Sequence, residues 1–327
     1  MKRREFIALV AGAAAWPIAA GAQPTRKVAR IGIVSIGGPT AHMTGPLPPN
    51  RTVRAFLRGM AELGYVYGRD FVTEPRGIDG IAAVAELVGL QVDAIVATGG
   101  GSVLSLLKQA TTTIPIVMTA ASDDPVRQGL VQSLAHPGKN FTGMSLQTLE
   151  LTGKRLELLK ELVPGAEVVA VFWDSTDAGL WPAASAVGQT RGWKLLSVEI
   201  RDVAKIVATF KTASNAGAGA LLIPASGLLF SHASQIVELA ALSRIPAMYE
   251  LRPYVDVGGL VSYGANIEDI WRRAATFVDK ILKGANPAEL PIEQPTKFEL
   301  VVNKRAATEL GLIVPPSILI RADEMIE

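Results

Sequence analysis

The sequence predicts an α/β protein of two lobes, each built on a doubly wound parallel sheet. Short β-branched apolar runs alternate with longer segments whose apolar residues recur at helical spacing, and this alternation runs through the chain twice. Strands that alternate with helices form right-handed crossover units in a parallel sheet covered on both faces. A chain of 327 residues is also long enough for two domains.

The first series of elements lies between residues 30 and 145. The run RIGIVSI at 30–36 predicts a buried strand because it is β-branched and ends at Gly37-Gly38-Pro39. Residues 50–63 carry an apolar stripe at helical spacing that stops at Gly64, which predicts a helix. By the same criteria we expect strands at 71–74, 93–98, 114–119 and 141–145, and helices at 81–90, 102–110 and 126–134.

The second series begins with an amphipathic helix at 149–162 that stops at Pro164-Gly165. The run EVVAVFW at 167–173 then predicts a buried strand. Further strands are expected at 194–199, 220–223, 246–249, 259–262 and 297–302, and further helices at 182–191, 203–214, 228–243, 269–282 and 304–310. Two lobes that face each other across their strand ends would enclose a cleft for a small molecule.

The first 22 residues predict an export signal rather than part of the fold. Basic residues at 2–4 precede an apolar stretch over 6–16, and Ala20-Gly21-Ala22 matches an A-x-A cleavage site. The stretch is too short to cross a bilayer, which needs about 20 residues. The Arg3-Arg4 pair resembles a twin-arginine signal, with an ordinary Sec signal as the alternative. Cleavage after Ala22 would leave the mature protein in the periplasm.

Composition excludes several classes of function. The chain has no cysteine, which removes disulfides, thiolate metal sites, iron–sulfur clusters and thiol nucleophiles. Its 32 basic and 30 acidic residues leave a formal charge of +2, without the basic excess of a nucleic-acid-binding protein. No stretch after the signal reaches 18 uninterrupted apolar residues, so no membrane span is expected. We expect a monomer with no cofactor and no nucleic-acid partner.

The patterns of common catalytic sites are also missing from the sequence. His42, His136 and His232 are too far apart for an H-x-x-x-H metal motif, and each is interpreted as a surface residue. No G-x-S-x-G motif occurs, and Ser231-His232 fits a helix start better than a catalytic triad. We therefore predict no catalytic residues and no metal site.

Residues that follow the strands are the candidate ligand contacts, because open α/β sheets bind ligands at the carboxyl ends of their strands. The segment 99–102 (GGGS) indicates a tight turn open to a ligand, with anion binding as the alternative. In the segment 122–125 (SDDP), Asp124 is interpreted as a helix cap that still allows ligand contact. Trp173-Asp174 and Tyr249-Glu250 follow strands of the second series, where the aromatic rings would either stack on a ligand or belong to the core.

With these motifs laid out, the chain resembles the bacterial ABC-transporter substrate-binding proteins of the group that includes the tryptophan/tyrosine-binding type. The resemblance covers nearly the whole chain. Its segments are 3–8 (RREFIA), 97–100 (ATGG), 110–117 (ATTTIPIV), 124–129 (DPVRQG), 140–145 (NFTGMS), 154–164 (KRLELLKELVP), 244–250 (RIPAMYE), 258–264 (GGLVSYG), 290–302 (LPIEQPTKFELVV) and 311–327.

The resemblance implies a type I periplasmic-binding fold with a hinge of three crossovers, near 145–148, 264–266 and 296–298. Lobe I would then comprise 23–145 plus 265–296, and lobe II 146–264 plus 297–327. Ligand contacts would come from strand-end loops. With Trp173 added from the pattern above, the candidate residues are Ser35, Gly37, Thr98, Gly99, Gly100, Thr119, Ala120, Ser122, Asp123, Asp124, Trp173, Asp174, Ala225, Ser226, Tyr249 and Tyr263.

Two departures from the family pattern bear on these expectations. The region 68–92 looks shorter than usual, and Trp173-Asp174-Ser175 stands where the family commonly carries an Asn-Pro pair. The second departure touches the expected pocket, so solute specificity does not transfer from relatives.

The resulting hypothesis is a periplasmic protein that closes around a small solute by hinge motion and delivers it to an ABC permease in the inner membrane. Helix starts after Thr98 and Asp124 would hold a carboxylate, Asp124 or Asp174 an ammonium group, and Trp173 or Tyr249 the apolar body. An amino acid or aromatic carboxylate is favoured. A ligand-sensing module for a membrane receptor and an α/β enzyme are the alternatives.

Overall fold

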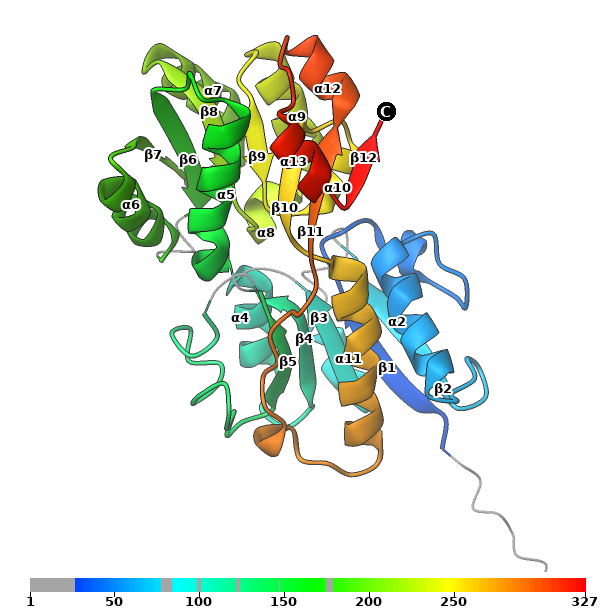
Figure 1. Ribbon diagram of the computed structural model, residues 1–327. Helices are drawn as coiled ribbons and strands as arrows, with labels where there is room; N and C mark the ends of the chain where they lie inside the picture. The colour runs from blue at the N-terminus through cyan, green and yellow to red at the C-terminus, as the bar shows by residue number, and fades with distance from the viewer. Residues whose placement is uncertain (1–26, 78–83, 99–100, 122–123, 147, 175–178) are drawn as a thin grey trace, which may run out of the picture.

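Two separate β-sheets, one in each half of the molecule, organise the fold (Figure 1). The structure is a computed structural model that describes residues 27–77, 84–98, 101–121, 124–146, 148–174 and 179–327. The expected Gly99, Gly100, Ser122 and Asp123 contacts and the export signal lie outside these residues. We call the half with the first sheet lobe I and the half with the second sheet lobe II.

Lobe I contains a five-stranded sheet in the order β2-β1-β3-β4-β5, in which every pair is parallel. Helices α2 and α11 cover one face, where their buried residues form one core with Ile31, Ile33 and Val96. The short helix α3 and helix α4 contribute Leu87, Leu104 and Leu107 to a second core on the opposite face. The strands are β1 (Ala29–Val34), β2 (Phe71–Arg76), β3 (Ala94–Thr98), β4 (Ile116–Ala121) and β5 (Phe141–Ser145), and the helices are η1 (Thr40–Met43), α2 (Arg51–Glu62), α3 (Glu86–Gly89), α4 (Gly101–Ala110), α11 (Ile267–Leu282) and η4 (Pro287–Glu289).

Lobe II contains a seven-stranded sheet in the order β12-β11-β10-β9-β8-β6-β7. Its strands are β6 (Val168–Asp174), β7 (Lys194–Ile200), β8 (Ala218–Ile223), β9 (Ala247–Tyr249), β10 (Val261–Ala265), β11 (Phe298–Asn303) and β12 (Glu324–Ile326). Helices α5 (Thr148–Leu162), α6 (Leu180–Arg191), α12 (Lys304–Glu309) and α13 (Pro316–Arg321) cover one face. Helices η3 (Val203–Lys205), α7 (Ile206–Asn215), α8 (Gly227–Phe230), α9 (Ala233–Leu242) and α10 (Arg252–Asp256) lie on the other.

The chain passes between the lobes three times: between β5 and α5, between β10 and α11, and along the segment that leads into β11 (Figure 1). Strand β11 is antiparallel to β10, whereas the other described pairs are parallel. The reversal has a simple cause. The chain leaves β10 toward lobe I at one end of the strands and returns into β11 at that same end. The expected all-parallel arrangement therefore fails at this one strand of lobe II.

The second crossover is tightly packed at Gly264, near the end of β10. A Cβ atom at Gly264 would lie 2.0 Å from the carbonyl oxygen of Glu250, so a side chain there would force the two backbones apart. Asn266 follows and begins α11, since its Oδ1 accepts from the Asp269 backbone N–H at 2.8 Å. Its Nδ2 donates to Glu299 of β11 at 2.8 Å, which joins the second crossover to the third.

Helices α2 and α11 pack closely, although more than 200 residues of chain separate their starts. Gly59 makes this approach possible, because a Cβ atom there would lie 2.3 Å from the Arg272 carbonyl oxygen. Trp271, in the first turns of α11, is fully buried beside this contact. The orange helix α11 accordingly lies against the blue helix α2 in Figure 1.

Some elements differ from the sequence-based expectation. The helix expected at 126–134 is wrong: residues 125–129 form turns, and Gly129 adopts a left-handed φ of +65° that stops helical continuation. The helix expected at 228–243 is divided into α8 and α9, and Ser231 at the break bonds the Leu228 carbonyl oxygen with its hydroxyl. Of the helix expected at 81–90, the described part is helical only over Glu86–Gly89. Helices α10 and α13 and strand β12 were not anticipated, because each is too short to show a period.

Candidate functional site

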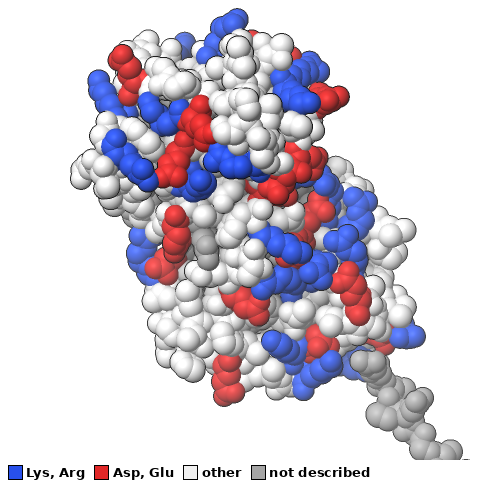
Figure 2. Space-filling model, viewed as in Figure 1, with Lys and Arg blue, Asp and Glu red and all other residues white. Residues whose placement is uncertain are grey.

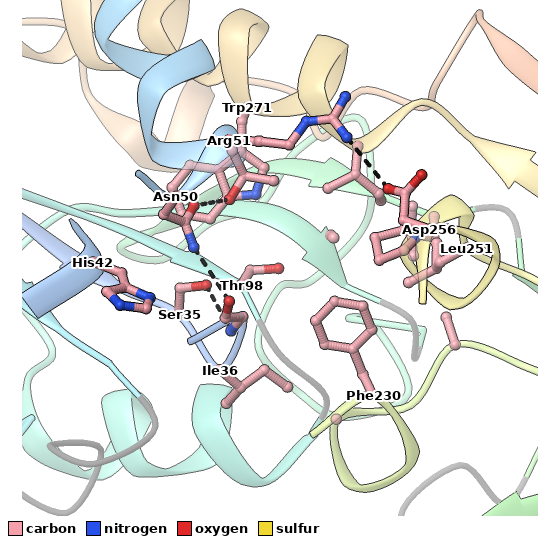
Figure 3. Close-up of a pocket in the computed structure, with 18 of the residues that line it drawn as sticks. Ser35, Ile36, His42, Asn50, Arg51, Thr98, Phe230, Leu251, Asp256 and Trp271 are labelled. Carbon is pink, nitrogen blue, oxygen red and sulfur yellow. Dashed lines mark hydrogen bonds and ion pairs between the residues drawn. The ribbon is translucent and has the colours of Figure 1, made fainter. Parts of the chain in front are cut away.

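A cavity of about 330 Å³ lies between the two lobes (Figure 3). Pockets that bind small molecules usually enclose about 300–1,000 Å³ and are mainly apolar with a few placed polar groups. This cavity has that character. Its lining residues are Ser35, Ile36, Gly37, His42, Pro49, Asn50, Arg51, Thr52, Thr98, Ala120, Leu146, Ala225, Ser226, Gly227, Phe230, Leu251, Pro253, Asp256, Ile267 and Trp271.

Lobe I supplies one wall from the carboxyl ends of its strands and the start of α2. The loop after β1 is held in place because Ser35 Oγ accepts from the Gly37 backbone N–H at 3.1 Å. Asn50 caps α2, since its Oδ1 accepts from the Val53 N–H at 3.0 Å, and its Nδ2 donates to the Gly37 carbonyl oxygen at 3.3 Å. The side chain of Asn50 therefore fixes the β1 loop and the helix start relative to each other.

Lobe II supplies the opposite wall from the loop after β8 and from helices α8 and α10. Ser226 caps α8, because its Oγ accepts from the Leu229 N–H at 3.0 Å. Phe230, at the end of α8, packs edge-on against Tyr254 with ring centroids 6.1 Å apart. Tyr254 in turn stacks on Tyr249 at 4.8 Å. This aromatic row supports the ring of Phe230, which Figure 3 shows beside the cavity.

Charged groups of the two lobes meet at the cavity. Arg51 Nη1 of α2 lies 3.3 Å from Asp256 Oδ2 of α10, and Arg51 Nη2 lies 2.6 Å from Glu268 of α11. Among the described lining residues, Arg51 is the one Arg or Lys and Asp256 is the one Asp or Glu. Their charges therefore offset each other within the cavity. A second cavity of about 400 Å³ shares both residues and is lined mainly by charged side chains.

One buried polar atom in the cavity wall has no partner within the described part of the chain. The Trp271 side chain is fully buried, and its indole Nε1 makes no hydrogen bond there. Buried N–H groups are nearly always hydrogen-bonded, because leaving one unpaired costs about 1–3 kcal/mol. Trp271 also lines the cavity, so its Nε1 is a candidate donor to a bound ligand.

Several of the sequence-predicted contact residues lie together in this cavity: Ser35, Gly37, Thr98, Ala120, Ala225 and Ser226. They share a position at or just after the carboxyl end of a strand.

Other predicted contacts lie outside the cavity lining. Thr119 is buried and donates to the Ala97 carbonyl oxygen at 3.1 Å. Asp124 is exposed, and its Oδ1 accepts from the Val126 N–H at 2.9 Å. Trp173 donates from Nε1 to Ser197 at 2.9 Å, and Asp174 is buried at the end of β6.

The two predicted tyrosines also lie outside that lining. Tyr249 belongs to the core, where burial raises the pKa of its hydroxyl, and Tyr263 packs beside Phe298. The pKa of the neighbouring Tyr254 is likewise raised well above its ordinary value. Burial is the main cause, and the nearby Tyr249, Glu250 and Asp174 add to it. The hydroxyls of Tyr249 and Tyr254 therefore remain neutral at physiological pH.

The sequence interpretation missed the helical contributions to the site. Arg51, Phe230, Asp256 and Trp271 lie on helices, so the strand-end rule does not select them. His42 was interpreted as a surface residue and is exposed, but it also lines the cavity. An available signal was Trp271, since a large aromatic ring in the first turns of a helix that returns to lobe I would lie near the lobe junction.

The family described as ABC transporter substrate binding protein matches residues 50–326. The chain belongs to this family. It is therefore a substrate-binding protein rather than an enzyme, and the resemblance inferred from its motifs is confirmed. Among curated proteins, a tyrosine-binding protein of Clostridioides difficile (strain R20291) is 25% identical over 274 residues, covering 80% of this chain and 77% of that protein.

Solved structures confirm the two-lobe fold of this binding protein. A conserved domain protein from Vibrio cholerae has a TM-score of 0.81 at 26% identity, covering 91% of this chain and 100% of that one. An ABC domain in complex with L-Trp from Streptococcus pneumoniae has a TM-score of 0.80 at 24% identity, with the same coverage. A ligand-free, open substrate-binding protein from Clostridium difficile has a TM-score of 0.65 at 22% identity, covering 91% of this chain and 99% of that one.

Metal sites and membrane spans are both missing from the described residues. No group of three or more His, Cys, Asp or Glu side chains in this part of the protein is arranged to hold a metal ion. Within the same residues, no helix has the length and apolar character needed to span a membrane.

Proposed function

We propose that this protein captures an amino acid or aromatic carboxylate in the cavity between its lobes and delivers it to an ABC permease of the inner membrane. The observation that carries the proposal is the cavity itself, whose walls come from both lobes and whose lining is mainly apolar. The solutes for which two similar proteins are named, tyrosine and L-Trp, support the class of solute.

The chemistry of the cavity suits such a solute. Phe230 and Leu251 of lobe II and Ile36 of lobe I offer apolar surface to an aromatic body. Trp271 Nε1 offers a donor to a carboxylate oxygen, and Arg51 and Asp256 offer one charge of each sign to a zwitterion. Candidate contacts of this proposal are the six predicted residues in the cavity together with these helical residues, in place of Trp173 and Tyr249 as the stacking groups.

Capture would proceed by motion of the two lobes about the three crossovers. Lobe I would comprise 23–145 plus 265–296, and lobe II 146–264 plus 297–327. The Arg51–Asp256 contact joins α2 to α10 across the cavity, so it would form when the lobes approach and break when they separate. The solute would enter and leave unchanged.

The place of action would be the periplasm, reached through a signal cleaved after Ala22. On the face shown in Figure 2, Lys and Arg are interspersed with Asp and Glu over both lobes. A mixture of this kind supports the absence of a nucleic-acid partner, because nucleic acid selects a surface rich in basic groups. The protein would act as a monomer.

A thermal-shift panel tests the proposal. The mature protein would be heated with each of the common amino acids and with a set of aromatic carboxylates. A solute present at about 100 times its dissociation constant stabilises the folded state by about 2.7 kcal/mol, which raises the midpoint measurably. If no member of either class raises the midpoint, the proposed solute class is wrong. A deletion strain separates transport from sensing, because loss of uptake would indicate transport and unchanged uptake would indicate sensing.

A further inference from the structure

A buried ion pair lies behind the cavity wall of lobe II. Arg155 of α5 and Glu250, which follows β9, are each 1% exposed, and Arg155 Nη2 lies 2.9 Å from Glu250 Oε1. Burial lowers the pKa of the Arg155 guanidinium, and the charge of Glu250 opposes that effect. An ion pair that is cut off from water costs desolvation energy that apolar residues would avoid, so its presence calls for a further explanation.

The contacts of this pair reach two of the three crossovers. Arg155 donates from Nη1 to the Thr148 carbonyl oxygen at 2.9 Å, and the Thr148 hydroxyl donates to Glu250 Oε1 at 2.8 Å. Thr148 is the first residue of α5, directly after the first crossover. Arg155 also donates from Nε to the Tyr263 carbonyl oxygen at 2.7 Å, on the strand that ends at the second crossover.

The other end of the pair reaches the cavity wall. Glu250 Oε2 accepts from the Ala225 backbone N–H at 2.8 Å, and Ala225 lines the cavity. Leu251, the neighbour of Glu250 in the chain, lines it as well. The Glu250 carboxylate thus connects the lobe II wall to the start of α5. The Arg155 guanidinium connects that carboxylate to β10.

We propose that Arg155 and Glu250 are positioning residues that make the lobe II cavity wall and the first two crossovers move as one unit. The proposal rests on the proposed function, since it explains how contact with a solute at Ala225 and Leu251 is transmitted to the hinge. Gly264 supports the coupling, because its backbone lies directly against the carbonyl group of Glu250. Neither residue belongs to the cavity lining.

The test uses the double variant Arg155→Leu/Glu250→Leu, which removes both charges and leaves no unpaired ion in the core. The matched control is Glu157→Gln. Glu157 lies on the same helix as Arg155, and the substitution breaks its exposed ion pair with Arg191 of α6. Should the double variant fail to fold, Thr148→Val removes one hydroxyl contact of Glu250 and keeps the ion pair.

Two measurements need no solute. Because the chain has no cysteine, spin labels at Gln109→Cys in lobe I and Lys211→Cys in lobe II report the distance between the lobes without background. We expect the distance distribution to broaden in the double variant and to stay unchanged in Glu157→Gln. Hydrogen exchange of the Ala225 amide should accelerate about tenfold or more, while amides inside β6 keep their protection.

Solute binding provides the third measurement. With L-tryptophan or L-tyrosine, whichever stabilises the wild type more, the dissociation constant should rise about tenfold in the double variant, within the range of typical coupling between sites. An unchanged distance distribution in a folded double variant would overturn the proposal whatever the Ala225 amide does, because that amide also loses its own acceptor on Glu250. A wild type that binds no solute would instead refute the proposed function, and the first two measurements would still decide the role of the pair.

Discussion

Trp271 shows how a single residue joins the core of lobe I to the cavity. Its ring is fully buried at the start of α11, yet it lines the space between the lobes. The packing of the ring accounts for a large apolar residue at this position. Packing does not account for an indole whose Nε1 finds no partner among the residues that the structure describes, since phenylalanine would fill a similar volume without a donor.

The Trp271→Phe variant should therefore lose affinity for the solute. Removing one hydrogen bond to a buried acceptor should weaken binding about fivefold, equivalent to about 1 kcal/mol, as measured by isothermal titration calorimetry. Trp181→Phe is the matched control, because Trp181 lies on α6 in lobe II and does not line the cavity. Equal affinities for the two variants and the wild type would exclude Trp271 as a donor to the solute.

At the residue scale, the sequence predicted residues of the cavity lining where one general rule applies. Ser35, Thr98 and Ala225 could be predicted because ligands of α/β sheets bind at the carboxyl ends of parallel strands. Tyr249 also ends a strand, but its ring turns into the core and stacks on Tyr254, and α10 was too short to be foreseen. Asp256 was missed for the same reason, because it belongs to that helix.

Helix contacts are the main feature at the scale of elements, and the contact of α2 with α11 depends on Gly59. Alanine normally stabilises a helix interior relative to glycine by roughly 0.5–1 kcal/mol. At Gly59 a methyl group would lie 2.3 Å from the Arg272 carbonyl oxygen and 2.9 Å from Ala275 Cβ. The helices would have to separate, and overpacking of this kind costs about 1–3 kcal/mol.

Gly59→Ala should accordingly lower the free energy of unfolding in urea. The matched control is Gly153→Ala in α5, where the nearest atom to the new methyl group would be Val187 Cγ2 at an ordinary 3.5 Å. That variant should be about 0.5–1 kcal/mol more stable than the wild type. Shifts of the same sign in the two variants would contradict the close contact between α2 and α11.

The elements themselves were predictable to different degrees. Long strands and helices such as β6 and α11 show a clear apolar run or stripe, so their existence followed from the sequence. The turn at 125–129 resembles a helix start, with Asp124 as cap and Pro125 in the first turn, and Asp124 does accept from the Val126 N–H. Gly129 then takes a left-handed conformation, which propensity alone does not reveal.

At the scale of the whole molecule, we expect the free energy of unfolding to depend on pH through two carboxylates of lobe II, Glu324 and Glu299. Their effects have opposite signs. The hydrogen bond from Arg252 lowers the pKa of Glu324 from its ordinary 4.5, despite some burial. Burial raises the pKa of Glu299, and the bond from Asn266 only partly opposes it. Ionised Glu324 therefore stabilises the fold above pH 4.5 and loses that effect as pH falls through its folded pKa. Glu299 behaves in reverse, because stability falls as pH rises through its raised pKa.

Two variants separate these effects in urea unfolding at pH 7, 5 and 3. Glu324→Gln should destabilise the protein at pH 7 and approach the wild type at pH 3. Glu299→Gln keeps an acceptor for Asn266 and removes the half-buried charge, so its stability relative to the wild type should rise from pH 3 to pH 7. A constant difference across this range for both variants would show that neither carboxylate titrates differently in the folded and unfolded states.

The insertion of α11 into lobe I has a consequence for synthesis. The sheet of lobe I is complete at Ser145, but its covering helix begins only at Ile267, after most of lobe II. Lobe II in turn needs β11 and β12 from the last thirty residues or so, a closure whose entropic cost grows only slowly with loop length. A nascent chain cut short before Asn266 would expose the apolar face of α2. Lobe I can therefore finish folding only after α11 has left the ribosome, and lobe II only after β12 has done so.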